Sequence, residues 1–481
     1  MRSLLKSGRA GAIALALATA TGFAACDTVK TNLLEATNPT IIDPKSVQSP
    51  GGATAVRNGA LASLRAATAD GESTWLFGGL LADEWASSST FVQNDETDQR
   101  SIQLNNGSVN NQLRTLYQVR TDANQAIALL TKYKPSPVAD VAEMYFARGF
   151  AELQLASDFC NGIPLSDGAG SVTVFGTPLT VSAVFGIASA SFDTALTITS
   201  GLADPASINV NRAASIAKAR ALLGIGLSNA PAAAALVAGI PTTYRYDVTA
   251  SLTGGNNILW GQPASSNRYT VSDSIQGNGR TIFVQNAIPF LSAKDRRVPA
   301  HYKIASNGKD SVKSQDGNTF VIQVDSLWGQ TTAVALTAGL DARLIEAEAA
   351  LQAGNGPGMM TILNALRASP QVLTAPSPTA SGTHPGWTVP VLPALVDPVA
   401  PGGRIALLFR EMAFWQFGRG HRLGDLRRMI RDYNYPADGS GNFPVGVHFK
   451  GGVFGTDVNL PVTTDEQIGN PKFTACLDRK A

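Results

Sequence analysis

Apolar residues recur at helical spacing over most of this 481-residue chain, and this spacing constrains its fold more than any other feature. Within residues 340–353, Leu340, Leu344, Ala347 and Leu351 stand at the i, i+4, i+7 and i+11 positions that share one face of an α-helix. A Gly-Asn-Gly sequence then breaks the helix, and the proline after it suits the first turn of a second helix. The segment therefore predicts a helical hairpin.

The same periodicity predicts further helices, separated by proline and glycine. Helix pairs of this length resemble tetratricopeptide stacking, in which each pair buries an apolar face against the next. No clean 34-residue repeat is present, so the pattern predicts a mainly α fold built as a bundle or solenoid. The remaining predicted helices cover residues 53–69, 74–85, 111–133, 138–158, 181–202, 211–227, 231–237, 357–370, 404–417 and 423–433.

Two segments interrupt the helical pattern. Residues 241–337 are rich in Asn, Ser, Gly and Thr and contain short β-like pieces at 281–284 and 319–324. Residues 374–401 are dense in proline. Both are too long for plain connections and are interpreted as irregular insertions. Loops held on a rigid scaffold commonly carry binding residues, so we expect ligand contacts in these insertions.

The N-terminus has the pattern of an export signal. Basic residues precede an uncharged, Ala-rich run over residues 11–25, which spans roughly 22 Å as a helix, short of a bilayer core of about 30 Å. The run ends Phe-Ala-Ala-Cys at Cys26, which resembles the lipobox of bacterial lipoproteins, with Phe23 at the usual Leu position. We predict a signal peptide over 1–25, lipid on Cys26 and a tether over 26–50. The alternative is an ordinary signal peptide with an incidental cysteine.

Cys160 and Cys476 are the two other cysteines of the chain. In an exported protein they could form a disulfide, and the alternative is two separate buried thiols. The sequence leaves this open, because it does not show whether the two residues are close.

Charge and motif content exclude several classes of function. The net charge is +2 with no basic run, so nucleic acid is not expected as a partner. The four histidines are far apart and show no metal-ligand spacing, and no nucleophile elbow or phosphate-binding loop occurs. We therefore expect no metal, no cofactor, no catalytic residue and no enzymatic activity.

Several short motifs occur in order along the chain. They are ARGFAEL at 147–153, DFCNGIPL at 158–165, DARLIEAEA at 341–349, LNALR at 363–367, REMAF at 410–414, HRLGDLRR at 421–428, and 461–471 with its Glu and closing Asn-Pro. Together they resemble the signatures of the SusD/RagB family of outer-membrane nutrient-binding lipoproteins, which commonly has glycine at the position of Cys160.

The resemblance implies one SusD-like domain over 51–481, with four tetratricopeptide-like units. It also implies attachment to the outer membrane through the lipid anchor, at the cell surface, with a SusC-like TonB-dependent transporter as partner and an oligosaccharide or peptide as ligand. Asp27 follows the lipobox cysteine, and in some bacteria this residue retains lipoproteins at the inner membrane, so the final membrane stays open. The alternative is a tetratricopeptide-type surface scaffold that binds proteins only.

The charged motif residues have two interpretations. Arg422, Asp425, Arg427 and Arg428 flank an apolar helix that contains Glu411. They could form a site for an anionic ligand. We favour ion pairs formed where a helix end enters the core, because buried charge requires a partner and arginine offers a bidentate one.

Aromatic residues are the better ligand candidates, because the apolar face of a sugar ring stacks on an aromatic plane while amide and charged groups bind its hydroxyls. Trp75, Trp85 and Trp415 lie in predicted helices and are expected in the core. Residues 91–100 add amide and carboxylate side chains near Trp85. The ligand candidates in the two insertions are Trp260, Asn267, Arg268, Tyr269, Trp328 and Trp387.

Overall fold

The computed structural model describes residues 47–481 apart from 170–171, 277–280 and 440–441. The predicted signal peptide and lipidated Cys26 lie outside the described residues. The first described helix begins at Pro50, at the end of the predicted tether, with the Ser49 hydroxyl accepting a hydrogen bond from the Gly52 amide.

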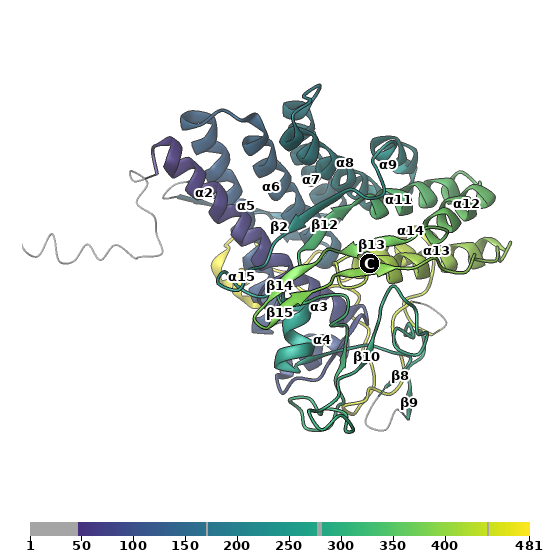
Figure 1. Ribbon diagram of the computed structural model, residues 1–481. Helices are drawn as coiled ribbons and strands as arrows, with labels where there is room; N and C mark the ends of the chain where they lie inside the picture. Colours follow the sequence, from purple (N-terminus) through teal and green to yellow (C-terminus); the bar gives the residue numbers. More distant parts are fainter. Residues whose placement is uncertain (1–46, 170–171, 277–280, 440–441) are drawn as a thin grey trace, which may run out of the picture.

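Most of the fold is a stack of antiparallel helices, seen in the upper part of Figure 1, in which successive members pack side by side. Its mainly α character and its construction from helix pairs confirm the sequence prediction. The stack contains α2 (Pro50–Thr68), α5 (Gly107–Tyr133), α6 (Val138–Asp158), α7 (Val181–Thr199), α8 (Pro205–Ile225), α9 (Ala230–Val237), α11 (Gly339–Gln352) and α12 (Gly356–Arg367).

One helix begins earlier than predicted. The apolar spacing predicts a helix over 211–227, but α8 begins at Pro205. The Asp204 carboxylate accepts a hydrogen bond from the Ser207 amide, and Pro205 occupies the first turn, where its missing N–H costs nothing. The pair is therefore a start signal for α8.

Two glycines allow α6, α7 and α8 to approach closely. A Cβ atom at Gly149 would lie 2.7 Å from the Phe192 ring of α7, and one at Gly224 would lie 2.6 Å from the Phe185 ring. Both glycines therefore serve helix packing. Among the described helices, α7 has the length and hydropathy of a membrane span, and its apolar character is explained by its packing between α6 and α8.

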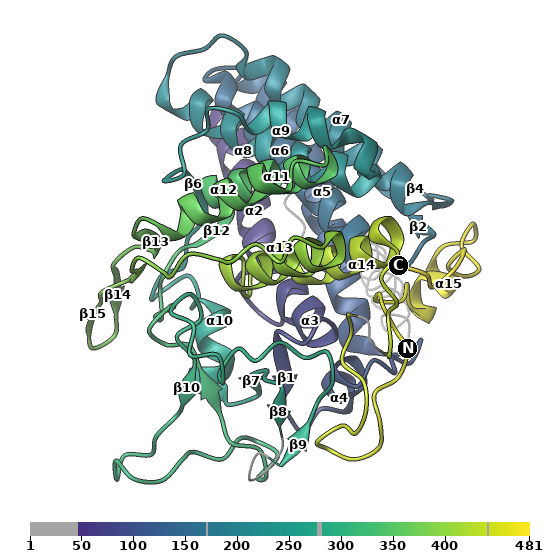
Figure 2. The ribbon, with the colours of Figure 1, turned by 90° about the vertical axis from the view of Figure 1, so that its right-hand side faces the viewer.

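A second group of helices lies between this stack and the irregular segments, as Figure 2 shows for α13 and α14. Trp75, Trp85 and Trp415 are buried there, which confirms their predicted place in the core. The group contains α3 (Thr74–Leu81), α4 (Val92–Asp98), α13 (Pro401–Trp415) and α14 (Arg422–Tyr433).

The long insertion is closed at its base by its own ends. Strand β6 (Arg245–Val248) pairs antiparallel with β12 (Val334–Ala338), so the chain leaves the helical stack and returns at one place. Further out, β7 (Tyr269–Val271) pairs with β1 (Trp85–Ser87), which attaches the insertion to the N-terminal half.

The other strands form short antiparallel pairs. They are β2 (Ile163–Pro164) with β5 (Pro178–Leu179), β3 (Asp167–Ala169) with β4 (Val172–Val174), β8 (Ile275–Gln276) with β9 (Ile282–Phe283), β10 (His301–Tyr302) with β11 (Ile322–Gln323), β13 (Gln371–Thr374) with β16 (Trp387–Val389), and β14 (Ser377–Thr379) with β15 (Gly382–His384). The remaining short helices are η1 (Leu227–Asn229), α10 (Ile258–Trp260), η2 (Gly261–Ser266) and α15 (Thr464–Gly469).

A disulfide joins Cys160, just after α6, to Cys476 near the C-terminus, with Cα atoms 6.1 Å apart. Backbone hydrogen bonds support the same contact, from the Cys160 amide to the Leu460 carbonyl at 2.9 Å and from the Leu477 amide to the Asn161 carbonyl at 2.7 Å. The structure thus contains the bridge that the sequence left open, and it connects residues 316 positions apart.

Replacing both cysteines, Cys160→Ala with Cys476→Ala, should lower the free energy of unfolding by about 2–5 kcal/mol, because a long loop in the unfolded chain is no longer closed. Urea denaturation with and without a reducing agent measures the effect. The reductant should destabilise the wild-type protein and leave the double variant unchanged. Equal sensitivity of both proteins would contradict the bridge.

Candidate functional site

Two predicted ligand residues are part of the core. Tyr269 is 0% exposed, and its hydroxyl accepts a hydrogen bond from the Asn94 amide at 3.0 Å. Trp328 is 2% exposed, and its ring stacks on Phe417 with the centroids 6.0 Å apart. Both rings are therefore covered by the core in this structure, and neither is presented at the surface.

Two further candidates are half-buried and lie apart from each other in the sequence and the fold. Trp260 ends α10 and packs against the core. Trp387 lies on β16, where its indole N–H donates to the Arg296 carbonyl at 2.8 Å and the Arg296 guanidinium lies 5.1 Å from its ring centroid. One face of Trp387 is therefore already occupied.

Asn267 and Arg268 lie at the surface of the insertion. Asn267 has a left-handed backbone with φ 53°, and its side-chain oxygen accepts a hydrogen bond from Lys303 at 2.7 Å. The Arg268 guanidinium lies 4.1 Å from the ring centroid of Phe91, a residue that is 43% exposed. Arg268 also donates to the Ser89 hydroxyl at 3.3 Å. We call Phe91, Arg268 and Ser89 the Phe91 ledge.

Lys450 connects this ledge to a neighbouring loop. Its ammonium group donates to the Ser89 carbonyl and to the Asp95 carboxylate, both at 2.6 Å. It also lies 3.7 Å from the carboxylate of Asp316 in the insertion. The lysine therefore holds together three surface segments that are distant in sequence.

Next to the ledge is a shallow pocket, which we call the loop pocket. It has about 30 Å³ of free volume and is lined by the aromatic rings of Tyr302, Phe320 and Phe449 together with Ile275 and polar residues of β7 and β8. Tyr302 and Phe320 meet edge to face, with centroids 6.5 Å apart. Among the described residues, the Oε1 atom of Gln276 is buried beneath the pocket and has no hydrogen-bond partner. The pocket thus offers apolar rings at its surface.

Buried polar residues fix the loop that carries Phe449. Its neighbour His448 is buried, with Nε2 3.1 Å from the Asp98 carboxylate. The same carboxylate accepts the Ser87 amide of β1 at 2.8 Å. The aromatic wall therefore rests on a rigid element, as a preorganised binding surface requires.

A neutral carboxyl group lies beneath the loop pocket. Burial raises the pKa of Asp83 to about 8, against hydrogen bonds from Ser272 and Gln276 that lower it. Burial likewise raises the pKa of the adjacent Glu84 to about 8, although the Gly418 amide donates to its carboxylate at 3.1 Å. At neutral pH both groups therefore hold a proton in most molecules.

The charged motif residues meet inside the protein. Glu411 of α13 accepts hydrogen bonds from Arg297 at 2.7 Å and from Arg367 at 3.0 Å. Arg428 donates to Glu348 and, at 2.9 Å, to Asp425. Glu411, Asp425 and Arg428 are therefore in buried ion pairs, as expected. Arg427 instead donates to the backbone carbonyls of Ala156 and Ser157.

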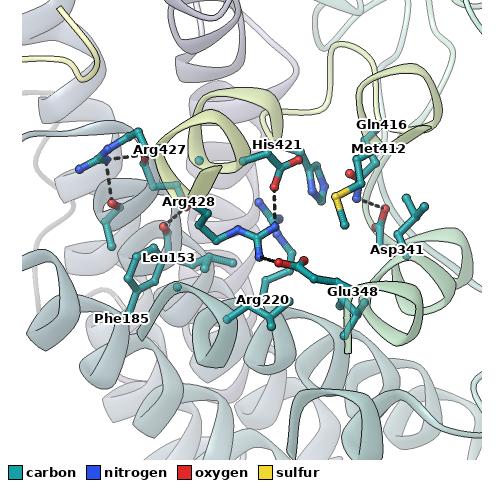
Figure 3. Close-up of a pocket in the computed structure, with 18 of the residues that line it drawn as sticks. Leu153, Phe185, Arg220, Asp341, Glu348, Met412, Gln416, His421, Arg427 and Arg428 are labelled. Atoms are coloured by element: carbon teal, nitrogen blue, oxygen red, sulfur yellow. Dashed lines mark hydrogen bonds and ion pairs between the residues drawn. The ribbon is translucent and has the colours of Figure 1, made fainter. Parts of the chain in front are cut away.

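An interior cavity lies beside these pairs, between α6, α8, α11 and α14. Figure 3 shows Arg220, Glu348, His421 and Arg428 around it. Its free volume is about 40 Å³, enough for roughly two or three water molecules. Among the described residues, this arrangement shows no catalytic geometry. The charged side chains around the cavity mainly join the helices to one another.

A larger polar cleft of about 660 Å³ opens on the helical stack, between α5, α6 and α7. Arg148 donates there to Asn124 and to the Ser191 hydroxyl, both at 3.1 Å. Arg120 donates to Glu152 at 3.0 Å. The side chains that line this cleft are therefore largely paired with one another.

The residues that line the loop pocket are not among the ligand residues predicted from the sequence. Phe449 lies in a segment with no helical period, and Phe320 was recognised only as part of a β-like piece. Phe91 begins a stretch that was noted for its amide and carboxylate groups. Among the described residues, no group of His, Cys, Asp and Glu side chains is arranged to hold a metal ion.

Comparison with solved structures identifies the fold. A SusD superfamily protein from Parabacteroides distasonis superposes with TM-score 0.59 at 12% identity, covering 88% of this chain and 98% of that one. One from Bacteroides vulgatus gives 0.57 at 14%, covering 90% and 99%. Surface glycan-binding protein A from Bacteroides uniformis gives 0.56 at 13%, covering 89% and 99%.

No family model matches the sequence, and no curated protein matches it. The similarity is therefore evident in three dimensions, over nearly the whole of each chain. This chain has the SusD-like fold, as its motifs indicated.

Asp83→Asn should make stability less dependent on pH. Because the pKa of Asp83 is raised on folding, its stabilising effect is present at low pH and is lost as pH rises from about 4 to 8. The variant should therefore become more stable relative to the wild type as the pH rises through that range. Asparagine tolerates the positive φ of 58° at this position.

Urea denaturation between pH 5 and pH 8 measures the difference. Asp193→Asn, which removes an exposed carboxylate of α7, is the control. Parallel pH profiles for Asp83→Asn and the wild-type protein would show that Asp83 titrates normally.

Proposed function

We propose that this protein is a lipid-anchored cell-surface protein that binds a glycan at the loop pocket and the Phe91 ledge and delivers it to a TonB-dependent transporter. The observation that carries the proposal is the aromatic surface itself. Three rings line the loop pocket, and an exposed ring under a guanidinium lies close by, all on loops fixed to a helical scaffold.

The chemistry of this surface suits a sugar. A pyranose presents C–H groups that pack on aromatic rings, and its hydroxyls pair with amide and charged groups. Phe320 and Phe449 supply rings, and Arg268 supplies donors at the rim. Because the free volume is about 30 Å³, the sugar would lie across the mouth of the pocket.

The structural neighbours support a glycan in preference to a peptide. One is described as a SusD-like carbohydrate-binding protein and another as a surface glycan-binding protein. We propose binding without turnover. The carboxylate that lines the pocket, Asp273, already accepts hydrogen bonds from the backbone and hydroxyl of Ser292.

A protein-binding scaffold is the alternative, and the polar cleft on α5, α6 and α7 favours it. A cleft of about 660 Å³ lined by Arg120, Asn124 and Arg148 has the size and polarity to receive a peptide segment. We rank this second because the cleft side chains are satisfied by one another, whereas the loop pocket presents three aromatic rings.

Phe449→Ala and Phe320→Ala should each weaken glycan binding about 5- to 30-fold, because each removes one stacking ring worth roughly 1–2 kcal/mol. Isothermal titration against a panel of glycans and peptides measures the affinity. The matched aromatic control is Trp387→Ala, which removes a ring from the other insertion and should leave affinity unchanged.

Gln125→Trp distinguishes the two functions. Gln125 is an exposed residue that lines the polar cleft, so the bulky side chain fills the cleft without breaking a pair. It should leave glycan binding intact and would abolish peptide binding if the scaffold function is correct. A protein that binds no glycan and co-purifies with no outer-membrane transporter would contradict the leading proposal.

Cys26→Ser should release the protein from the membrane fraction, because several acyl chains on one residue are needed for stable anchoring. Palmitate labelling followed by membrane fractionation measures both attachment and location. Cys476→Ser is the control, since Cys476 forms the disulfide. Retained label in Cys26→Ser would refute the anchor.

A further inference from the structure

The interior cavity contains one guanidinium that has no ionic partner. Arg220 of α8 lines the cavity, and among the described residues no carboxylate lies within the 4.0 Å ion-pair distance of it. Its buried Nη1 atom has no hydrogen-bond partner in the protein. By contrast, the neighbouring Arg428 pairs with both Glu348 and Asp425.

The acids around Arg220 are engaged elsewhere. Asp341 of α11 pairs with Arg419 at 2.7 Å, and Asp425 pairs with Arg428 at 2.9 Å. Asp158 of α6 accepts a hydrogen bond from Gln154 at 2.8 Å, and burial raises its pKa to about 7. The Oε2 atom of Glu348 and the Oδ1 atom of Asp158 are buried without hydrogen-bond partners, and neither carboxylate lies within ion-pair distance of Arg220. Arg220 therefore has no direct ionic partner among the described residues.

Other cations add to the positive charge around the cavity. Arg427 lines the same cavity and donates to the carbonyls of Ala156 and Ser157, while its Nε and Nη2 atoms are buried without partners. Arg431 lies at the mouth and pairs with Asp432. A buried charge without a partner is costly, so this excess favours a bound anion.

The donors around the cavity suit an anion. His421, whose ring faces the cavity in Figure 3, has a buried Nε2 atom without a partner, and burial lowers its pKa well below the usual value. A neutral imidazole can present an N–H, and Arg220 can present several. The free volume of about 40 Å³ accommodates an ion slightly larger than water and is too small for a sugar.

We propose that this cavity binds a small monovalent inorganic anion, such as chloride, beside the Arg220 guanidinium. The ion compensates the unpaired charge at the place where α8 meets α11 and α14. It therefore stabilises the junction between the helical stack and the helices beneath it. The site is separate from the loop pocket and takes a different class of ligand.

Thermal unfolding in sodium chloride and in sodium gluconate at equal ionic strength tests the proposal. Above saturation, the wild-type Tm should rise by about 1–2 °C for each tenfold increase in chloride. Arg220→Gln should lose this dependence. Arg212→Gln, on the same helix with its guanidinium 5.8 Å from the Tyr244 ring, should keep it.

Anomalous diffraction from wild-type crystals grown with bromide gives an independent test that does not require a variant to fold. A bromide peak within hydrogen-bonding distance of Arg220 would support the site. The proposal would be overturned if the cavity contained only water in crystals grown with bromide. It would also be overturned if chloride raised the Tm of Arg220→Gln as much as that of the wild-type protein.

Discussion

One buried carboxylate joins three parts of this fold. Glu411 of α13 accepts hydrogen bonds from Arg297 of the long insertion and from Arg367 of α12. Removing Glu411 would leave the buried guanidinium of Arg367 without its ionic partner, which is costly. The carboxylate therefore holds the insertion, the helical stack and α13 in one arrangement.

Much of this architecture could be predicted from the sequence, because the features that determine it lie close together in the sequence. The period of apolar residues defines α6 and α11 almost to the residue, and proline and glycine end most helices where expected. The start of α8 was missed since Asp204-Pro205 is ambiguous out of context. The same pair can end one segment or cap the helix that follows. The tertiary packing of α8 determines which of the two occurs.

The binding surface could be predicted only in part, because exposure is a tertiary property. Tyr269 and Phe91 are both aromatic residues in polar stretches, yet strand pairing with β1 places Tyr269 inside and leaves Phe91 at the surface. Arg268, one of the predicted ligand residues, lies against the ring of Phe91. Phe449 lies far from both in sequence and comes close through the contacts of Lys450 and His448.

The pairing of β6 with β12 has a consequence for how such proteins diversify. Since the segment between them leaves and re-enters the scaffold at one place, the parts of it away from the Arg297–Glu411 ion pair and the β7–β1 pairing can change in length without moving the helices. The entropic cost of a longer closed loop grows only logarithmically, so additions there are inexpensive. Relatives that keep those two contacts can therefore carry different surface segments on the same framework.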